Sequence, residues 1–370
     1  MQDALIVCGT RPEIIKLAPL YHCMRASDWV RPHWLHTGQH DEMARQMLAC
    51  FGIVPDISLD RVGDGLHEFS VRCRGLLDSV MSDGSWSLVV VQGDTESTFL
   101  GALCGFHHRV PVAHVEAGLR TYDLERPFPE EGLRQMVSRI TRFHFAPTER
   151  AAQALRAEAI PHEHVFVTGN TVIDAQHWVV RHHRIQRRVE GRGHLLVTAH
   201  RRENWGSDLR EICHAIADVA NRHPELQVLF PVHLNPVVGQ PVHAILGGLA
   251  NVHLSLPFDY LDMQQALVDS WLVLTDSGGL QEEAPTFGVP LLVLRTETER
   301  PEAVETGCAR LAGTKRESIT RQIEALWSDP AAYQSMARAG NPFGDGQASI
   351  RIVDVLQNAL ACGEHLRTAV

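Results

Sequence analysis

Residues 88–95 read L-V-V-V-Q-G-D-T, an aliphatic run that gives way to a glycine and an acidic residue. Such a run, bounded by a polar turn, is typical of a strand buried on both faces of a parallel sheet. Amphipathic stretches with helical spacing, such as residues 130–141, lie between runs of this kind. The pattern predicts further strands at residues 4–8, 34–37, 112–115, 143–146, 194–198, 227–232, 252–256, 271–275 and 290–294. This alternation predicts an α/β fold with two doubly wound, parallel-sheet, Rossmann-like domains.

The two predicted domains join near residues 168–174, where an apolar run ends in Gly-Asn-Thr. A polar helix is expected over residues 181–192, and residues 350–360 have the spacing of a last amphipathic helix. Ligands of open parallel sheets bind beyond the carboxyl ends of the strands. The expected site is therefore a cleft between two facing domains.

The composition of the chain excludes several classes of ligand and cofactor. The chain has 370 residues, enough for two or three domains, and a net charge of −10, which argues against nucleic acid or a membrane surface as a partner. Eight cysteines without a C-x-x-C pair predict reduced thiols and a cytoplasmic location. Metal-binding, dinucleotide and P-loop motifs are absent from the sequence, so no metal and no cofactor are predicted.

Three carboxylates are the most informative feature of the sequence. Asp94 and Glu116 follow the predicted strands at 88–91 and 112–115, and Glu130 opens the helical stretch 130–141. In such a group one carboxyl can act as an acid while another acts as a base. The structural alternatives are a helix cap for Asp94 and a favourable helix-dipole position for Glu130.

Two turns have features of a phosphate site. The first, G-T-R-P-E at residues 9–13, follows the first strand and brings Arg11 and Lys16 to a helix N-terminus. The alternative is a capped surface helix with solvated charges.

The second turn, D-S-G-G-L-Q-E-E-A at residues 276–284, is the stronger signal. Backbone amides at Gly278 and Gly279 and the hydroxyl of Ser277 suit phosphate oxygens, and Glu283 suits ribose hydroxyls. Arg300, after the next strand, adds charge. A plain glycine-rich turn is the alternative.

Two histidines follow strands of the second half. His200 comes after the strand at 194–198 and is placed to contact a phosphate or a leaving group. His233, in P-V-H-L-N-P, is the weaker candidate, because a histidine after a strand is more often packed or solvated.

Taken together, these motifs resemble the non-hydrolysing UDP-N-acetylglucosamine 2-epimerase family. The resemblance covers nearly the whole chain, in order, through G-T-R-P-E-I-I-K, T-G-Q-H-D-E-M, Q-G-D-T, H-V-E-A-G-L-R, P-E-E, T-G-N-T-V-I-D-A, H-R-R-E-N, P-V-H-L-N-P, T-D-S-G-G-L-Q-E-E-A, T-E-R-P-E and N-P-F-G-D-G-Q-A. It implies the GT-B architecture. The expected domains are residues 1–170, joined by a C-terminal helix at about 350–370 that crosses back to them, and residues 171–349, which bind UDP.

By resemblance, the reaction is reversible interconversion of UDP-N-acetylglucosamine and UDP-N-acetylmannosamine, supplying surface polysaccharide. UDP leaves C1, the C2 proton is lost to give a 2-acetamidoglucal, and UDP adds back after proton return on the opposite face. UDP and both UDP-sugars are the implied ligands, no cofactor is implied, and a homodimer is the family expectation.

The resemblance also implies roles for individual residues. The acid/base set falls on Asp94, Glu116 and Glu130, with His200 as a further catalytic candidate. An activating second site for UDP-N-acetylglucosamine, beside the active site, matches Gln39, His40, Arg202 and His233. The family's substrate contacts fall on Arg11, Lys16, Phe258, Met263, Ser277, Gly278, Gly279, Glu283 and Arg300. Met263 stands where members often carry Phe against the uracil, and Thr296 replaces a frequent Asp.

Three other functions remain open from the sequence. A GT-B glycosyltransferase would share the nucleotide turn but need an acceptor site. A hydrolysing epimerase would release free N-acetylmannosamine and UDP. A protein that binds nucleotide sugars without catalysing a reaction on them would not need the three carboxylates.

Overall fold

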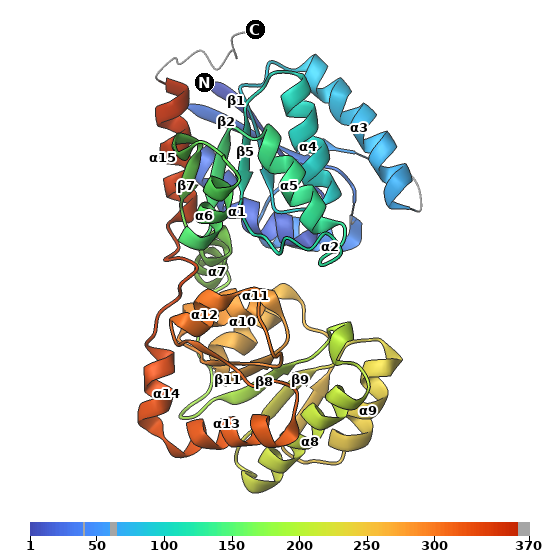
Figure 1. Ribbon diagram of the computed structural model, residues 1–370, viewed down its shortest axis with the longest axis vertical. Coiled ribbons are helices and arrows are strands. Elements are labelled where there is room, and N and C mark those ends of the chain that lie inside the picture. Colours follow the sequence, from blue (N-terminus) through green and yellow to red (C-terminus); the bar gives the residue numbers. More distant parts are fainter. Residues whose placement is uncertain (40, 60–64, 362–370) are drawn as a thin grey trace. The chain divides into compact units, whose positions relative to one another are not determined.

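The structure is a computed structural model and describes residues 1–39, 41–59 and 65–361. It divides into two compact units (Figure 1), unit 1 comprising Met1–Trp178 with Phe343–Val370 and unit 2 comprising Val179–Pro342. Each unit contains one wholly parallel sheet between helices. The predicted fold class is confirmed.

Unit 1 contains a seven-stranded sheet in the order β3-β2-β1-β4-β5-β6-β7. Its strands are β1 (Gln2–Cys8), β2 (Val30–His36), β3 (Ile57–Ser58), β4 (Leu88–Gln92), β5 (Val112–Val115), β6 (Phe143–Ala146) and β7 (Val165–Val167). All of β4 and β5 is buried, as expected for strands covered on both faces. The strand order reverses between β1 and β4, which is where doubly wound sheets bind ligands.

Helices cover both faces of this sheet. They are α1 (Arg11–Arg25), α2 (Asp41–Cys50), α3 (Leu66–Asp83), α4 (Glu96–His107), α5 (Glu130–Ile140), α6 (Glu149–Ala157), α7 (Thr171–His182) and α15 (Ala348–Ala361), with a 3-10 turn η1 (His162–His164). The last of them, α15, packs against α1 (Figure 1), and the amide of Gln2 donates to the carbonyl of Leu360. The predicted return of the C-terminal helix to the first domain is therefore confirmed.

Unit 2 contains a six-stranded sheet in the order β10-β9-β8-β11-β12-β13, and the order reverses between β8 and β11. Its strands are β8 (His194–Thr198), β9 (Val228–Pro231), β10 (Val252–Ser255), β11 (Ser270–Thr275), β12 (Leu291–Val293) and β13 (Ala309–Leu311). Its helices are α8 (Ser207–Arg222), α9 (Pro236–Leu246), α10 (Tyr260–Asp269), α11 (Gly278–Glu283), α12 (Pro301–Glu305), α13 (Arg316–Ser328) and α14 (Pro330–Ala337), with 3-10 turns η2 (Arg202–Asn204) and η3 (Ala284–Phe287).

One helix prediction was wrong. Residues 181–192 do not form a helix beyond the end of α7 at His182, and residues 185–190 have no regular secondary structure. The helix lies earlier, where Val172, Ile173 and Val179 supply a buried apolar face. The segment after it offers only Ile185 as a buried aliphatic anchor, so it has no apolar stripe to stabilise a helix.

Candidate active site

The turns that follow β1 and β4 meet at the switch point of unit 1, and a buried carboxylate joins them. Glu13 accepts hydrogen bonds from the amides of Gly9 (3.0 Å) and Thr10 (2.7 Å) and from the hydroxyl of Thr95 (2.6 Å). A side chain at Gly9 would overlap the hydroxyl of Thr37, so the turn requires glycine. The Gly9 and Thr10 amides therefore bind Glu13, and of the two cations of this turn Lys16 pairs with Glu116.

Glu116 lies directly after β5 and is held by several donors. Its carboxylate binds the ammonium of Lys16 and the amide of Gln92, and it accepts a third hydrogen bond from the Asn170 amide at 3.1 Å. Its backbone is left-handed, with φ of 63°, a conformation that costs a non-glycine residue about 1–2 kcal/mol. Strain of this kind is retained where the surrounding structure fixes one side-chain position, and this carboxylate is fixed between three donors.

Asp94 follows β4, the neighbouring strand, and has a different partner. Its carboxylate pairs with Arg134 of α5 at 2.6 Å. Glu130 is the half-buried first residue of the same helix, four positions before Arg134 and therefore on the same face. A β-carbon placed on Gly93 would lie 3.8 Å from the Glu116 carboxylate, so Glu116 is adjacent to the turn that carries Asp94.

Asp94 and Glu116 therefore lie on adjacent turns, each with its own cation, whereas Glu130 is linked to them only through its place on the helix that carries Arg134. Lys16 pairs with Glu116 and Arg134 pairs with Asp94. Arg134, Gln92 and Asn170 were not recognised as site residues in the sequence, although two of them lie within the quoted Q-G-D-T and T-G-N-T motifs.

The buried histidine His114 contacts the backbone of the turn that carries Asp94. The ring of His114 contacts the carbonyl of Gly93 through Nε2 at 2.7 Å, so Nε2 carries the proton. Burial lowers the pKa of His114 to about 3. This imidazole is therefore neutral in the folded protein at ordinary pH.

The depressed pKa predicts a loss of stability in mild acid. In the unfolded chain a histidine takes up its proton near pH ~6.5, whereas His114 in the fold does not until about pH 3. Below pH ~6.5 the unfolded state binds one more proton, so the free energy of unfolding should fall by about 1.4 kcal/mol per pH unit. Urea unfolding of wild type and His114→Gln at about pH 7 and about pH 5.5 measures this contribution. The variant should lose less stability on acidification than wild type, and exposed His107→Gln should match wild type; equal losses in His114→Gln and wild type would contradict the assignment.

In unit 2, the turn after β11 is built around the fully buried Asp276. Its Oδ2 accepts the amides of His200 and Arg201, both at 2.9 Å, and the side-chain amide of Asn204 at 3.0 Å. The turns that follow β8 and β11 are thereby locked together at the switch point of the second sheet.

The predicted nucleotide residues gather at this edge of unit 2. Gly278 and Gly279 begin α11, and the guanidinium of Arg201 lies 3.5 Å from where a β-carbon of Gly278 would be. Arg201 adds a cation to the turn and was missed in the sequence, although it lies in the quoted H-R-R-E-N motif. Glu283 accepts a hydrogen bond of 2.6 Å from Gln264 of α10, the residue after Met263.

The other predicted residues of unit 2 have identifiable surroundings. Arg300 precedes α12 and pairs with the buried Glu282, so part of its guanidinium is engaged within the protein. The rings of His200 and His233 stack with centroids 6.4 Å apart. Phe258 is half-buried in the loop before α10, and Arg202 opens η2.

The proposed second-site residues are distributed over both units. Gln39 belongs to unit 1, where its side-chain carbonyl accepts the hydroxyl of Ser97 at 2.6 Å. Arg202 and His233 belong to unit 2. His40 lies outside the described residues.

Within the described ranges, no three His, Cys, Asp or Glu side chains converge in a way suited to a metal ion. Every helix in that part of the chain is too short or too polar to cross a lipid bilayer.

Two doubly wound parallel sheets, each with candidate residues at its switch point, define the class of protein. The structure matches that of Acinetobacter baumannii MurG with a TM-score of 0.63 at 15% identity, covering 96% of this chain and 99% of that one. A likeness at this identity shows the fold alone, which is the GT-B architecture.

The chain belongs to the UDP-N-acetylglucosamine 2-epimerase family, whose model matches residues 22–357. It is 46% identical to the UDP-N-acetylglucosamine 2-epimerase of Yersinia pestis over 368 residues, covering 96% of this chain and 98% of the relative. A crystal structure of the Neisseria meningitidis UDP-GlcNAc 2-epimerase, bound to UDP-GlcNAc, matches with a TM-score of 0.87 at 39% identity, covering 96% of this chain and all of that one. The family suggested by the sequence motifs is confirmed.

Proposed function

We propose that this protein interconverts UDP-N-acetylglucosamine and UDP-N-acetylmannosamine without net hydrolysis. The observation that carries the proposal is the arrangement in unit 1, where Asp94 and Glu116 follow neighbouring strands and each pairs with its own cation. Family membership over nearly the full chain supports the same substrate. A glycosyltransferase is not favoured, because the identity to named epimerases extends over 96% of the chain.

The chemistry of the sugar explains why more than one carboxyl group is needed. The hydrogen at C2 is not acidic, because no carbonyl carbon is attached to that position. Departure of UDP from C1 develops positive charge there and acidifies the C2 hydrogen, which passes to a carboxylate and leaves a 2-acetamidoglucal. Protonation from the opposite face and re-addition of UDP to C1 invert C2, so acid/base groups must serve both faces.

In this proposal the residues of unit 1 transfer protons and those of unit 2 retain UDP. Asp94, Glu116 and Glu130 form the acid/base set, with Arg11 and Lys16 as cations near the leaving diphosphate. His200 contributes a ring beside the nucleotide turn, held by Asp276. Ser277, Gly278, Gly279, Glu283 and Arg300 contact the nucleotide, with Phe258 and Met263 near the base. Firm retention of UDP favours its re-addition over hydrolysis.

Product analysis tests the non-hydrolysing assignment. Purified protein incubated with UDP-N-acetylglucosamine should give a stable mixture with UDP-N-acetylmannosamine, and the same mixture should form from either sugar, as followed by proton and phosphorus NMR. Free N-acetylmannosamine accumulating with UDP would instead establish the hydrolysing reaction. If neither product forms when no acceptor is present, the assignment as an epimerase is contradicted.

Other family expectations remain predictions. These are activation by UDP-N-acetylglucosamine through Gln39, His40, Arg202 and His233, a homodimer, a cytoplasmic location and a supply of N-acetylmannosamine units to surface polysaccharide.

A further inference from the structure

Unit 2 contains a pocket of about 440 Å³ that is separate from its nucleotide turn. The pocket lies at the amino ends of β8 and β11, where Gly193 precedes β8 and Trp271 is the second residue of β11. Asp276 follows the last residue of β11, five positions after Trp271. At ~3.3 Å per residue, these five positions place the pocket about 16 Å from the nucleotide turn, at the opposite ends of the strands of the same sheet.

The backbone is shaped around this pocket. Ser270 pairs with His194 and Leu272 with Leu195, so Trp271 is an extra residue that forms a bulge. A side chain at Gly193 would lie 2.0 Å from the carbonyl oxygen of Asp269, so this close approach requires glycine. Bulges at sheet ends redirect a side chain, and here the bulge turns Trp271 toward the pocket.

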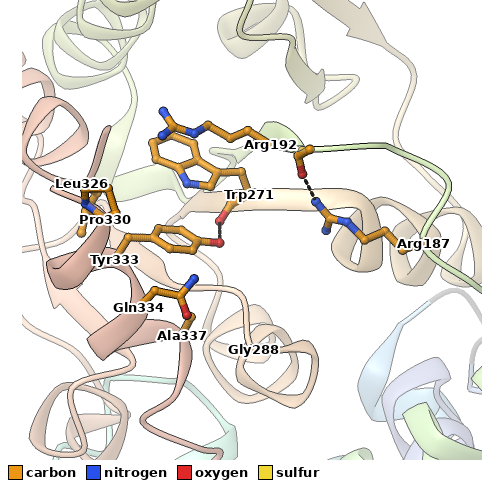
Figure 2. A pocket seen from close by; sticks show the side chains of 11 residues that line it. Arg187, Arg192, Trp271, Gly288, Leu326, Pro330, Tyr333, Gln334 and Ala337 are labelled. Atoms are coloured by element: carbon orange, nitrogen blue, oxygen red, sulfur yellow. Dashed lines mark hydrogen bonds between the residues drawn. The ribbon is translucent and has the colours of Figure 1, made fainter. Parts of the chain in front are cut away.

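Aromatic rings form one wall. Trp271 and Tyr333 stack with centroids 5.7 Å apart and ring planes at 16°, and the Tyr333 hydroxyl donates to the Trp271 carbonyl at 2.8 Å (Figure 2). This hydrogen bond and the stacking fix both rings. Trp271 is 4% exposed, with Tyr333 and Arg192 against its ring, so the half-buried Tyr333 supplies most of the apolar surface that this wall offers to a ligand.

Two guanidinium groups lie at the same pocket, and both are held in place. Arg192 stacks over the ring of Trp327 at 3.8 Å and over Trp271 at 5.2 Å. Arg187 donates to the carbonyls of Gly191 (3.0 Å) and Val268 (3.2 Å), the first of which is drawn in Figure 2. Their donors are therefore pre-positioned, which lowers the entropy that binding would cost.

No ion pair joins these two cations, Arg187 and Arg192, to a carboxylate in the part of the chain that the structure describes, and the pocket lining there contains no Asp or Glu. This local excess of positive charge contrasts with the net charge of −10 of the chain. Two acidic residues lie near this segment. Glu190 is exposed, and the buried Asp269 accepts the backbone amide of Arg188 at 2.6 Å.

We propose that this pocket binds a small organic anion with a flat apolar ring. The ring lies against Tyr333, which Trp271 backs, and the anionic group, a carboxylate or a phosphate, is bound by Arg187 and Arg192. The volume falls within the range of small-molecule sites, ~300–1,000 Å³. The inference concerns a second site and does not depend on the reaction proposed for the first. The competing explanation is that the two arginine side chains only cover aromatic surface.

Calorimetric titrations of the full-length protein in saturating UDP test the proposal, with the nucleotide turn thereby occupied. The probes are 2-naphthoate, 2-naphthyl phosphate and the neutral 2-naphthamide. We expect saturable binding of at least one anion with one ligand per chain, about tenfold or more weaker binding of 2-naphthamide, and a similar loss in the Arg187→Gln, Arg192→Gln double variant. The preferred anion identifies the head group.

Exposed Arg188 lies in the same segment but does not line the pocket, so Arg188→Gln is the matched control and should bind like wild type. If loss of the Trp327 stack unfolds the double variant, Arg187→Gln alone decides, because the hydrogen bonds of Arg187 among the described residues go to backbone carbonyls. Undiminished binding in that variant, equal affinity for the neutral probe, or no saturable binding would overturn the proposal.

Discussion

Glu116→Gln should lower kcat for epimerisation by about 10³-fold while leaving UDP binding near the wild-type level. An amide at this position cannot accept a proton, and its NH₂ group would face the donors of Lys16, Gln92 and Asn170. The proposed UDP contacts lie mainly in unit 2, so this substitution in unit 1 should disturb them little. Initial rates by NMR and UDP affinity by calorimetry measure the two effects separately.

Asp94→Asn should have an effect of similar size, because it removes the other cation-paired carboxylate of unit 1. The matched control is Glu68→Gln, an exposed carboxylate of α3 that forms a surface ion pair with Arg72, and it should retain full activity. Wild-type rates in both Glu116→Gln and Asp94→Asn would remove these carboxylates from the mechanism.

Asp276→Ala should lower the free energy of unfolding by about 3 kcal/mol and weaken UDP binding. The substitution leaves the amides of His200 and Arg201 and the side chain of Asn204 without their common buried acceptor. The His200 turn would then lose its fixed position beside the nucleotide turn. Urea unfolding and calorimetric titration with UDP measure the two consequences.

A graded series sharpens this test. Asp276→Asn keeps one carbonyl oxygen as an acceptor, so its loss of stability should be smaller than that of the alanine variant. Glu297→Ala removes an exposed carboxylate from the loop after β12 and should change stability by less than about 0.5 kcal/mol. An alanine variant as stable as Glu297→Ala would show that Asp276 does not hold the two turns together.

Much of the fold could be predicted because apolar runs mark buried parallel strands. The predicted strand at 88–91 is observed as Leu88–Gln92, and those at 112–115 and 143–146 match β5 and β6. The strands β3, β7 and β13 were not predicted, since they have only two or three residues each and such runs are too short for periodicity to identify. The helix predicted at 181–192 was wrong because its charged composition lacks an apolar face.

The candidate site was only partly predictable for a different reason. Asp94 and Glu116 could be predicted because strand ends share one edge of a sheet, which follows from topology. Their partners depend on tertiary packing, since Lys16 is 100 residues from Glu116 and Asn170 is 54 residues from it. Asp276 is part of the T-D-S-G-G-L-Q-E-E-A motif. Its burial against the His200 turn, however, follows only from the register of β8 and β11.

Solvent isotope incorporation tests the central claim most directly. The protein, UDP-N-acetylglucosamine and D₂O are incubated together, and the C2 position of recovered substrate and product is followed by proton NMR and mass spectrometry. Loss and return of a proton at C2 predict one deuterium at that carbon in UDP-N-acetylmannosamine, and progressively in recovered UDP-N-acetylglucosamine. Formation of UDP-N-acetylmannosamine that retains its original C2 hydrogen would contradict the account.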